Sequence, residues 1–213
     1  MKKISIVDYG LGNLFSVNQA LEFCNEGKNK IVVTSSASEI EASDFLVLPG
    51  VGAFKNAIHE IEVRNLADAI KNFAFSERPL LGICLGMQLF ASESKEFGVH
   101  KGLDLIAGKV THIGEANKDG SLRKVPVIGW KNINLSQSIP ENSILSSHQA
   151  APLYLVHSYH FTPLQADHII ATYPHGDSAI TAAVQRNNII GCQFHPEKSG
   201  PRGLDIIKRF LNL

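Results

Sequence analysis

The feature that most constrains the fold is a series of short, continuously apolar runs separated by helical patterns in the first 90 residues. Four such runs predict strands: 4–7, 31–33, 45–48 and 80–83. Residues 14–23 and 54–73 space their apolar side chains three and four apart, which predicts amphipathic helices. Strands that are apolar on both faces are typical of a parallel sheet covered by helices on both sides. The predicted fold class is therefore α/β, with a mostly parallel central sheet.

From about residue 108 the strand candidates become shorter and are separated by Pro, Asn, Gly and Ser. They cover residues 109–113, 127–135, 154–161 and 189–194. We expect them to add antiparallel strands to the same sheet, the polar stretch 117–124 to form a mobile hairpin, and 203–213 to form a final helix. No repeat or linker divides the chain, so residues 1–213 are predicted to form a single domain.

Composition excludes several classes of function. Twenty basic and twenty acidic residues give a net charge of zero, so no overall field favours nucleic acid or an anionic membrane. No apolar run approaches the roughly eighteen residues that cross a bilayer, and the N-terminal apolar run is too short for a signal peptide. Cys24, Cys84 and Cys192 lie far apart and form no disulfide framework. We therefore expect a cytoplasmic protein whose partners are small molecules or another protein.

One of these cysteines stands in a sequence typical of a nucleophile. Gly82-Ile83-Cys84-Leu85-Gly86 has the G-x-nucleophile-x-G form, in which small flanking residues permit a sharp turn from a strand into a helix. At the start of a helix, free N–H groups and the helix dipole favour the thiolate form of Cys84. A lone cysteine in an apolar run is also a common core residue. The pentapeptide by itself leaves both alternatives open.

A base for this cysteine is offered by the stretch GCQFHPEKSG at 191–200. Pro196 biases His195 toward an extended conformation, in which residues two apart project to the same side. Glu197 is then placed to accept a hydrogen bond from one ring nitrogen of His195 and to leave the other nitrogen facing the thiol. His-Pro-Glu alone is more typical of a polar turn at the end of a strand. Together with the elbow, it favours a Cys-His-Glu triad.

Acyl chemistry also requires hydrogen-bond donors for a developing oxyanion. The backbone N–H of Leu85, the residue after the cysteine, is one candidate. The stretch LPGVGAF at 48–54 is a second source, because Gly50 and Gly52 permit unusual backbone angles at the end of a strand. The alternative for this loop is an ordinary connection between a strand and a helix.

Two further patterns do not indicate cofactors. The stretch DYGLGN at 8–13 follows the first strand like a nucleotide-binding loop, but Phe15 stands where a third glycine is required. His148, His157 and His160 have neither helical spacing nor an accompanying cysteine, and the last two are expected on opposite faces of one strand. We predict no metal and no cofactor.

With these motifs in hand, the chain resembles the triad-type (class I) glutamine amidotransferases, and among them the glutaminase subunits of imidazole glycerol phosphate synthases. The resemblance covers nearly the whole chain. It rests on six blocks in the expected order: VDYGLGNLFSV at 7–17, LPGVGAF at 48–54, LLGICLGMQLF at 80–90, VPVIGW at 125–130, LVHSYHF at 155–161 and GCQFHPEKSGPRGL at 191–204. It implies a flavodoxin-like single domain with helices on both faces of the sheet and added antiparallel strands.

The resemblance also implies a reaction. Cys84 would attack the side-chain amide of L-glutamine, His195 would pass a proton to the departing ammonia, and Glu197 would orient His195. Water would then release glutamate from the thioester. The residues implied for the oxyanion hole are Leu85, Gly50 and Val51, and those implied to hold glutamine are Gly52, Gln88, Ser158 and Tyr159.

A partner follows from the same resemblance. It would be a separate (β/α)8 cyclase that receives ammonia through its barrel and makes imidazole glycerol phosphate and aminoimidazole carboxamide ribotide in histidine biosynthesis. Nothing in this sequence is suited to bind the cyclase substrate, as expected of a subunit that makes only ammonia. Asn13, Trp130 and Lys198 match positions at or near the partner face, so a heterodimer is expected.

The sequence departs from the family in one of these blocks. Where the family commonly has a histidine and an asparagine in P-H-x-G-W-N, this chain has Val127 and Lys131. This puts the partner-facing block, though not the triad, in question, and two alternatives stay open for the chain as a whole. One is a paralogous subunit that feeds ammonia to a cyclase-like partner in the amidination of surface sugars, and the other is a thiol hydrolase on the same fold.

Overall fold

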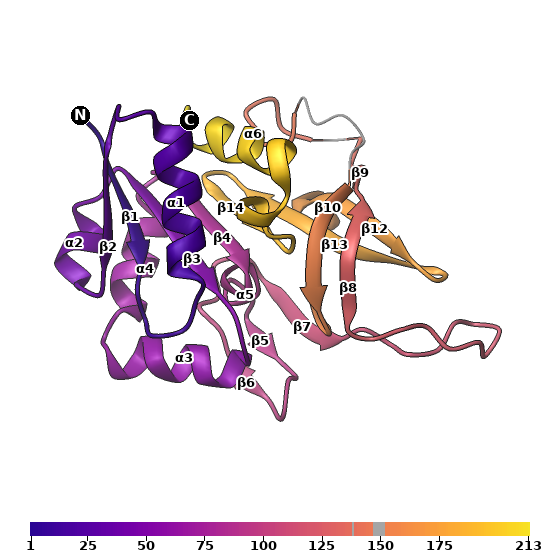
Figure 1. The fold of residues 1–213 in the computed structure, drawn as a ribbon. Helices are drawn as coiled ribbons and strands as arrows, with labels where there is room; N and C mark the ends of the chain where they lie inside the picture. The colour runs from indigo at the N-terminus through magenta and orange to yellow at the C-terminus, as the bar shows by residue number, and fades with distance from the viewer. Residues whose placement is uncertain (138, 147–151) are drawn as a thin grey trace.

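An eight-stranded sheet forms the centre of the computed structural model, which describes residues 1–137, 139–146 and 152–213 (Figure 1). Its strand order is β2-β1-β3-β4-β14-β13-β12-β9. The strands from β2 to β14 in this order run parallel, and the last three pairs are antiparallel. The bounds are β1 (Lys3–Val7), β2 (Lys30–Thr34), β3 (Phe45–Gly50), β4 (Leu80–Cys84), β9 (Asn134–Leu135), β12 (Ile169–His175), β13 (Ser178–Arg186) and β14 (Ile189–Cys192).

Helices cover both faces of the parallel strands, because successive strand residues project to opposite faces of the sheet and both sets are apolar. Ile4, Ile6 and Phe45 pack with helices α1 (Leu14–Asn25) and α6 (Gly200–Phe210) in one buried cluster. Leu46 and Leu48 pack with helices α2 (Ala37–Glu41), α3 (Phe54–Val63) and α4 (Ala67–Ala74) in a second cluster. The prediction of an α/β fold with a mostly parallel central sheet is confirmed.

The predicted single helix over 54–73 is wrong, because two helices, α3 and α4, occupy this stretch. The chain turns at Asn65, whose backbone is left-handed (φ 56°), a conformation that asparagine tolerates better than most residues. The N–H groups of Asn65 and Leu66 bond back to Glu62 and Ile61. The apolar spacing continues across the turn because both helices pack on the same face of the sheet.

Two smaller sheets stand beside the central one. Their strands are β5 (Glu93–Ser94), β6 (His100–Lys101), β7 (Gly108–His112) and β11 (Tyr159–Pro163) in one, and β8 (Val127–Asn132) and β10 (Pro152–His157) in the other. The expectation that the later strand candidates all extend the central sheet antiparallel is therefore wrong. The candidates at 109–113 and 154–161 lie outside it, as does most of the candidate at 127–135, while β14 joins it parallel to β4. Strands β12 and β13 lie outside the predicted strand candidates.

The break inside the predicted strand 154–161 falls at Ser158, where the chain leaves β10 and enters β11. The Ser158 carbonyl accepts a hydrogen bond from the N–H of Ile113 at 2.8 Å. Because His157 and His160 lie on different strands, the prediction that they occupy opposite faces of one strand is wrong. His148 lies outside the described residues.

The remaining segments are short. Residues 117–124 form a turn that is closed by a bridge between Ala116 and Leu122 and bonded to the β12–β13 connection through the Asp177 carboxylate. The final helix begins at Gly200, earlier than predicted. In the described part of the chain, no helix combines the length and apolar character needed to span a membrane.

Candidate active site

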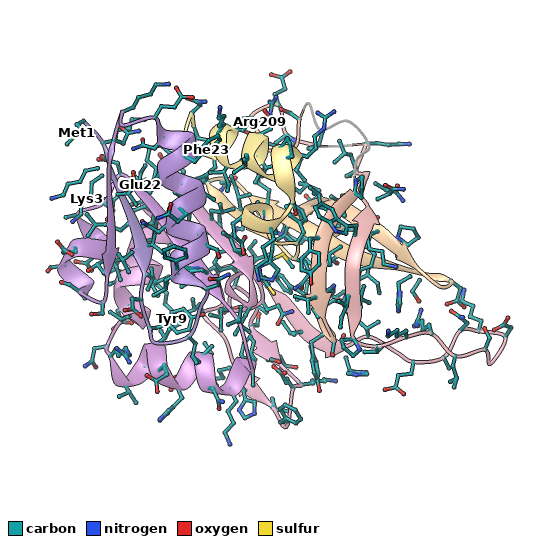
Figure 2. The ribbon with its side chains drawn as sticks, in the orientation of Figure 1. Met1, Lys3, Tyr9, Glu22, Phe23 and Arg209 are labelled. Carbon is teal, nitrogen blue, oxygen red and sulfur yellow. The ribbon has the colours of Figure 1, made fainter. Side chains whose placement is uncertain are left out.

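The carboxyl ends of the parallel strands form the edge of the sheet at which the predicted site residues meet. Figure 2 shows this polarity along β1, with Met1 and Lys3 at one end and Tyr9 beyond the other. Strands β3, β4 and β14 are direct neighbours. Consequently the loop after β3, the elbow after β4 and the His195 segment after β14 all lie at this edge, which is where open α/β sheets bind their ligands.

Cys84 occupies a strained elbow. It ends β4 with φ 55° and ψ −109°, and the helix α5 (Leu85–Gln88) begins directly after it. A Cβ on Gly86 would stand 1.8 Å from the carbonyl oxygen of Leu48, and one on Gly82 would stand 2.5 Å from the Phe90 ring. Close packing therefore requires both glycines. The predicted contribution of a helix dipole is not supported, since α5 has only four residues.

His195 and Glu197 form a buried pair. Their side chains are 3% and 1% exposed, and His195 Nδ1 lies 2.8 Å from Glu197 Oε1. His195 is extended (φ −98°, ψ 96°), as Pro196 predicts, and Glu197 reaches it through the single turn η2 (Pro196–Lys198). Burial opposes the charged form, but the interactions with Cys84 and Glu197 outweigh it and raise the pKa of His195 to about 10. The imidazole is therefore protonated at neutral pH.

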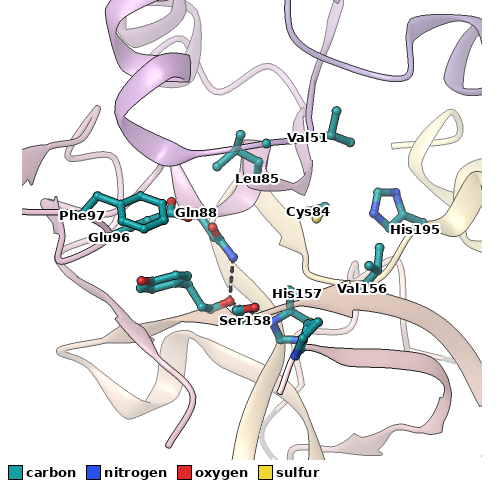
Figure 3. A pocket seen from close by; sticks show the side chains of 13 residues that line it. Val51, Cys84, Leu85, Gln88, Glu96, Phe97, Val156, His157, Ser158 and His195 are labelled. Carbon is teal, nitrogen blue, oxygen red and sulfur yellow. Dashed lines mark hydrogen bonds between the residues drawn. The ribbon is translucent and has the colours of Figure 1, made fainter. Parts of the chain in front are cut away.

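A cavity of about 390 Å³ brings the predicted residues together (Figure 3). Cys84 and His195 line it side by side. The other predicted residues on its wall are Val51, Gly52, Leu85, Gln88, Ser158 and Tyr159. Gly50 does not line it but lies against the elbow, since a Cβ there would stand 3.1 Å from the Gly86 nitrogen. Gly52 has a left-handed backbone (φ 97°) with open space around it, so its conformation, not its size, calls for glycine.

Gln88 is held by two hydrogen bonds from its amide nitrogen. Nε2 donates to the carbonyl oxygen of Tyr159 at 2.8 Å and to Oε1 of Gln193 at 2.9 Å. The Nε2 of Gln193 in turn lies 3.6 Å from Cys84 Sγ. Both donors of Gln88 are thus occupied, which leaves its Oε1 as an acceptor. Sequence reasoning missed Gln193, although a polar residue between Cys192 and Phe194, at the end of an apolar strand, was a signal for it.

A second residue that the sequence did not indicate is Glu96. It lines the cavity and is buried, and its Oε2 accepts a hydrogen bond from the N–H of Phe54 at 2.7 Å. The neighbouring Phe97 also lines the cavity, and its ring lies 6.5 Å from that of Tyr159. Nothing in the local sequence around Glu96 distinguishes it from a surface carboxylate.

The residues predicted at a partner face lie outside the cavity. Asn13 caps helix α1 by accepting a hydrogen bond from the N–H of Ser16. Trp130 is 54% exposed on β8, with its ring 6.0 Å from that of Tyr154. Lys198 is exposed in η2. Among the described residues, His, Cys, Asp and Glu side chains form no group of three that could hold a metal ion.

Comparison with known proteins agrees with this geometry. The family model for "Glutamine amidotransferase class-I" matches residues 5–213, so the chain belongs to the class-I glutamine amidotransferases. Two solved structures share the fold: PurLQS from Thermotoga maritima (TM-score 0.70, 16% identity, 100% of this chain and 99% of that chain) and a glutamine amidotransferase (TM-score 0.70, 14% identity, 98% and 97%).

Curated relatives narrow the family. The chain is 44% identical to imidazole glycerol phosphate synthase subunit HisH 1 of Legionella pneumophila (strain Paris), over the whole of both chains. It is 38% identical to the HisH subunit of Geobacillus thermodenitrificans, over 100% of this chain and 97% of that one, and 41% identical to the HisH subunit of Zymomonas mobilis, over 98% and 95%. Within the class-I glutamine amidotransferases, the chain belongs to the HisH family.

Proposed function

We propose that this chain is the glutaminase subunit of an imidazole glycerol phosphate synthase. It hydrolyses L-glutamine to glutamate and ammonia and passes the ammonia to a (β/α)8 cyclase subunit in histidine biosynthesis. The observation that carries the proposal is one cavity in which a cysteine on a strained elbow stands beside a buried His195–Glu197 pair. The family membership supports the same reaction.

In the proposed reaction, Cys84 Sγ attacks the side-chain amide carbon of glutamine. The protonated His195 stabilises negative charge on the neighbouring sulfur as it attacks. It then gives its proton to the departing nitrogen, which leaves as ammonia. The neutral His195 next takes a proton from water, whose oxygen attacks the thioester and releases glutamate. Glu197 accepts the Nδ1–H of His195 throughout and stabilises the imidazolium.

The tetrahedral intermediate of each step carries a negative oxygen. We assign its donors to the N–H of Leu85 and to the peptide between Gly50 and Val51, which packs beside the start of α5. Val51 and Gly52 line the cavity without a helix or strand to constrain them. This loop is therefore free to present its N–H groups when substrate is bound.

Polar groups on the opposite wall suit the α-amino acid end of glutamine. The Glu96 carboxylate and the free Oε1 of Gln88 are acceptors for the α-ammonium group. The backbone at Ser158 and Tyr159 is proposed to donate to the α-carboxylate, because both carbonyl oxygens of this pair already accept hydrogen bonds from within the protein. Gly52 completes the wall.

The proposed partner face is the outer side of the β8–β10 sheet. Ile128, Trp130 and Val156 are large apolar side chains that remain exposed there. An apolar surface of this kind is typical of a protein interface. We place Asn13 and Lys198 at the same interface by their match to the family. A cytoplasmic location is proposed because the three cysteines are free, buried thiols.

The test is glutamate release by the purified chain, measured alone and with the cyclase subunit and the cyclase ligand. The proposal expects slow release alone and much faster release in the complex. Cys84→Ala is expected to abolish glutamate release while synthesis from added ammonia by the complex continues. Equal rates alone and in complex would contradict coupling, and loss of both activities would give Cys84 a structural role.

A glutamine-affinity label separates the proposal from a thiol hydrolase. The reagent 6-diazo-5-oxo-norleucine is expected to modify Cys84. If a general thiol reagent modified Cys84 and this label did not, the cavity would serve a different substrate.

A further inference from the structure

The cavity wall at Ser158 and Tyr159 is tied to the central sheet by hydrogen bonds that the proposed reaction does not use. His157 ends β10, Tyr159 begins β11, and Tyr173 lies on β12. These three strands belong to three different sheets. His157 Nδ1 lies 2.8 Å from the Tyr159 carbonyl oxygen, and Nε2 of the same ring lies 2.8 Å from the Tyr173 hydroxyl.

The direction of each bond follows from the atoms involved. A carbonyl oxygen only accepts, so Nδ1 of His157 carries the proton that is donated to Tyr159. Burial lowers the pKa of His157 to about 4, so the ring is neutral at pH 7 and its Nε2 is an acceptor. The Tyr173 hydroxyl must then donate to Nε2, and burial raises the pKa of Tyr173, which keeps this hydroxyl protonated. At neutral pH the three groups therefore have one proton arrangement.

The same chain of bonds reaches the reacting sulfur. The Tyr159 carbonyl oxygen accepts a second bond from Gln88, which is bonded to Gln193, which in turn lies 3.6 Å from Cys84 Sγ. Both lone pairs of the Tyr159 oxygen are thus occupied, and the orientation of this peptide is set from two sides. One side is the elbow helix α5, and the other is the His157 ring, whose own orientation is set by Tyr173.

We propose that His157 and Tyr173 are positioning residues for glutamine: they hold the Ser158–Tyr159 backbone at the distance from Cys84 that the substrate requires. This inference rests on the proposed function, because it concerns the wall assigned to the α-carboxylate. Neither residue belongs to the Cys84–His195–Glu197 group, so their loss acts on binding and not on the chemical step.

Tyr173→Phe tests this directly, because it removes the hydroxyl and keeps the ring, which packs edge-on against His157 with centroids 5.9 Å apart. In the complex with the cyclase, the KM for glutamine is expected to rise roughly fivefold, the size expected for one lost hydrogen bond. The value of kcat per active site, counted by titration with 6-diazo-5-oxo-norleucine, is expected to stay within about twofold.

A second variant keeps the test valid if Tyr173→Phe folds poorly. In His157→Asn, the side-chain nitrogen stands near the place of Nδ1, so the donation to Tyr159 is retained while the contact with Tyr173 is lost. His157→Asn should also raise KM. The KM of the double variant should not exceed the higher of the two single-variant values, since both changes break the same chain of hydrogen bonds. His168→Asn, a change in the short helix η1 (Ala166–His168) outside the cavity, is the matched control and should leave KM unchanged.

A spectroscopic readout separates this proposal from the proposed function. The ¹⁵N chemical shifts of His157 should show a protonated Nδ1 and an unprotonated Nε2, and Tyr173→Phe should shift the Nε2 resonance. If the wild-type complex released no glutamate, the proposed function would fail whatever these shifts showed. If the wild type were active and Tyr173→Phe changed the Nε2 shift without raising KM, or lowered kcat alone, the positioning role would be overturned.

Discussion

Glu197→Gln is the most informative change in the site because it removes a charge and little else. The glutamine amide has the same size, and its oxygen is able to accept the Nδ1–H of His195 as the carboxylate does at 2.8 Å. What is lost is the negative charge that, with Cys84, raises the pKa of His195 from 6.5 to about 10 against the effect of burial. At about 1.4 kcal/mol for each tenfold change in proton affinity, this difference corresponds to roughly 5 kcal/mol in favour of the imidazolium.

In the wild-type complex, kcat/KM for glutamine should therefore stay high through neutral pH and fall only as the pH rises toward about 10, where His195 loses its proton. In Glu197→Gln, burial of the ring is unchanged while one source of stabilisation is gone. The decline of kcat/KM at high pH, the falling limb of the pH–rate profile, should therefore move to neutral pH or below. The rate at pH 8 should drop by about 10²- to 10⁴-fold. Lowering the pH should restore part of the rate.

The assay is a pH–rate profile of glutamate release by the complex for the wild type and for Glu197→Gln, with Glu96→Gln as the matched control. Glu96 is a carboxylate of the same cavity that accepts its hydrogen bond from the Phe54 N–H and does not contribute to the raised pKa of His195, so its loss should raise KM and leave the falling limb in place. A falling limb that stays near pH 10 in Glu197→Gln would refute the argument that this carboxylate holds the proton on His195.

The raised pKa of His195 also contributes to folding stability. Because the folded-state pKa of His195 lies above its unfolded value, the contribution is complete below pH 6.5 and is lost as the pH rises through about 10. Chemical denaturation at several pH values should therefore show a wild-type advantage over Glu197→Gln that shrinks between these limits. An advantage that grew with pH over this range would contradict the sign of the shift.

Three further changes test other parts of the site. Gly86→Ala places a Cβ 1.8 Å from the Leu48 carbonyl oxygen and should lower the free energy of unfolding by about 3 kcal/mol or prevent folding; a soluble, equally stable variant in urea denaturation would contradict the packing at the elbow. Tyr9→Phe leaves the buried carbonyl oxygen of Pro49 without its 2.7 Å donor, so it should destabilise by about 1–3 kcal/mol and lower kcat through the adjoining oxyanion loop, which urea denaturation and glutamate release would check. Trp130→Ala should change stability by less than about 0.5 kcal/mol because the ring is half exposed, yet weaken binding to the cyclase in titration calorimetry; unchanged affinity would remove Trp130 from the interface.

The parallel half of the fold was predictable from sequence because its signal is local. Strands such as β3 and β4 are buried on both faces along their whole length, so they appear as continuous apolar runs that no exposed element would contain. The elbow at Cys84 was predictable for a similar reason. Gly82 and Gly86 are demanded by contacts within the same strand-to-helix turn and its neighbour, and such a demand leaves a fixed spacing in the chain.

The second half was predicted less well because strand pairing is not a local property. An apolar run at 154–161 looks like one strand, and nothing in it reports that the chain changes sheets at Ser158. The predicted helix over 54–73 failed for a related reason, since its apolar spacing reflects burial against one sheet face and not continuity of the backbone at Asn65.

The sequence by itself therefore determined the α/β class, the parallel direction of the first strands, and a cysteine at a sharp turn with a His-Pro-Glu segment far along the chain. Only the tertiary structure decided that Glu96 and His157 line the cavity beside this cysteine, and that Gln193 and Tyr173 support its wall through hydrogen bonds to Gln88 and His157. Their hydrogen-bonding partners are distant in the chain and lie on separate elements, for example 105 residues apart for Gln88 and Gln193. Local periodicity records which side of an element is buried, but not which groups meet there once the sheets are assembled.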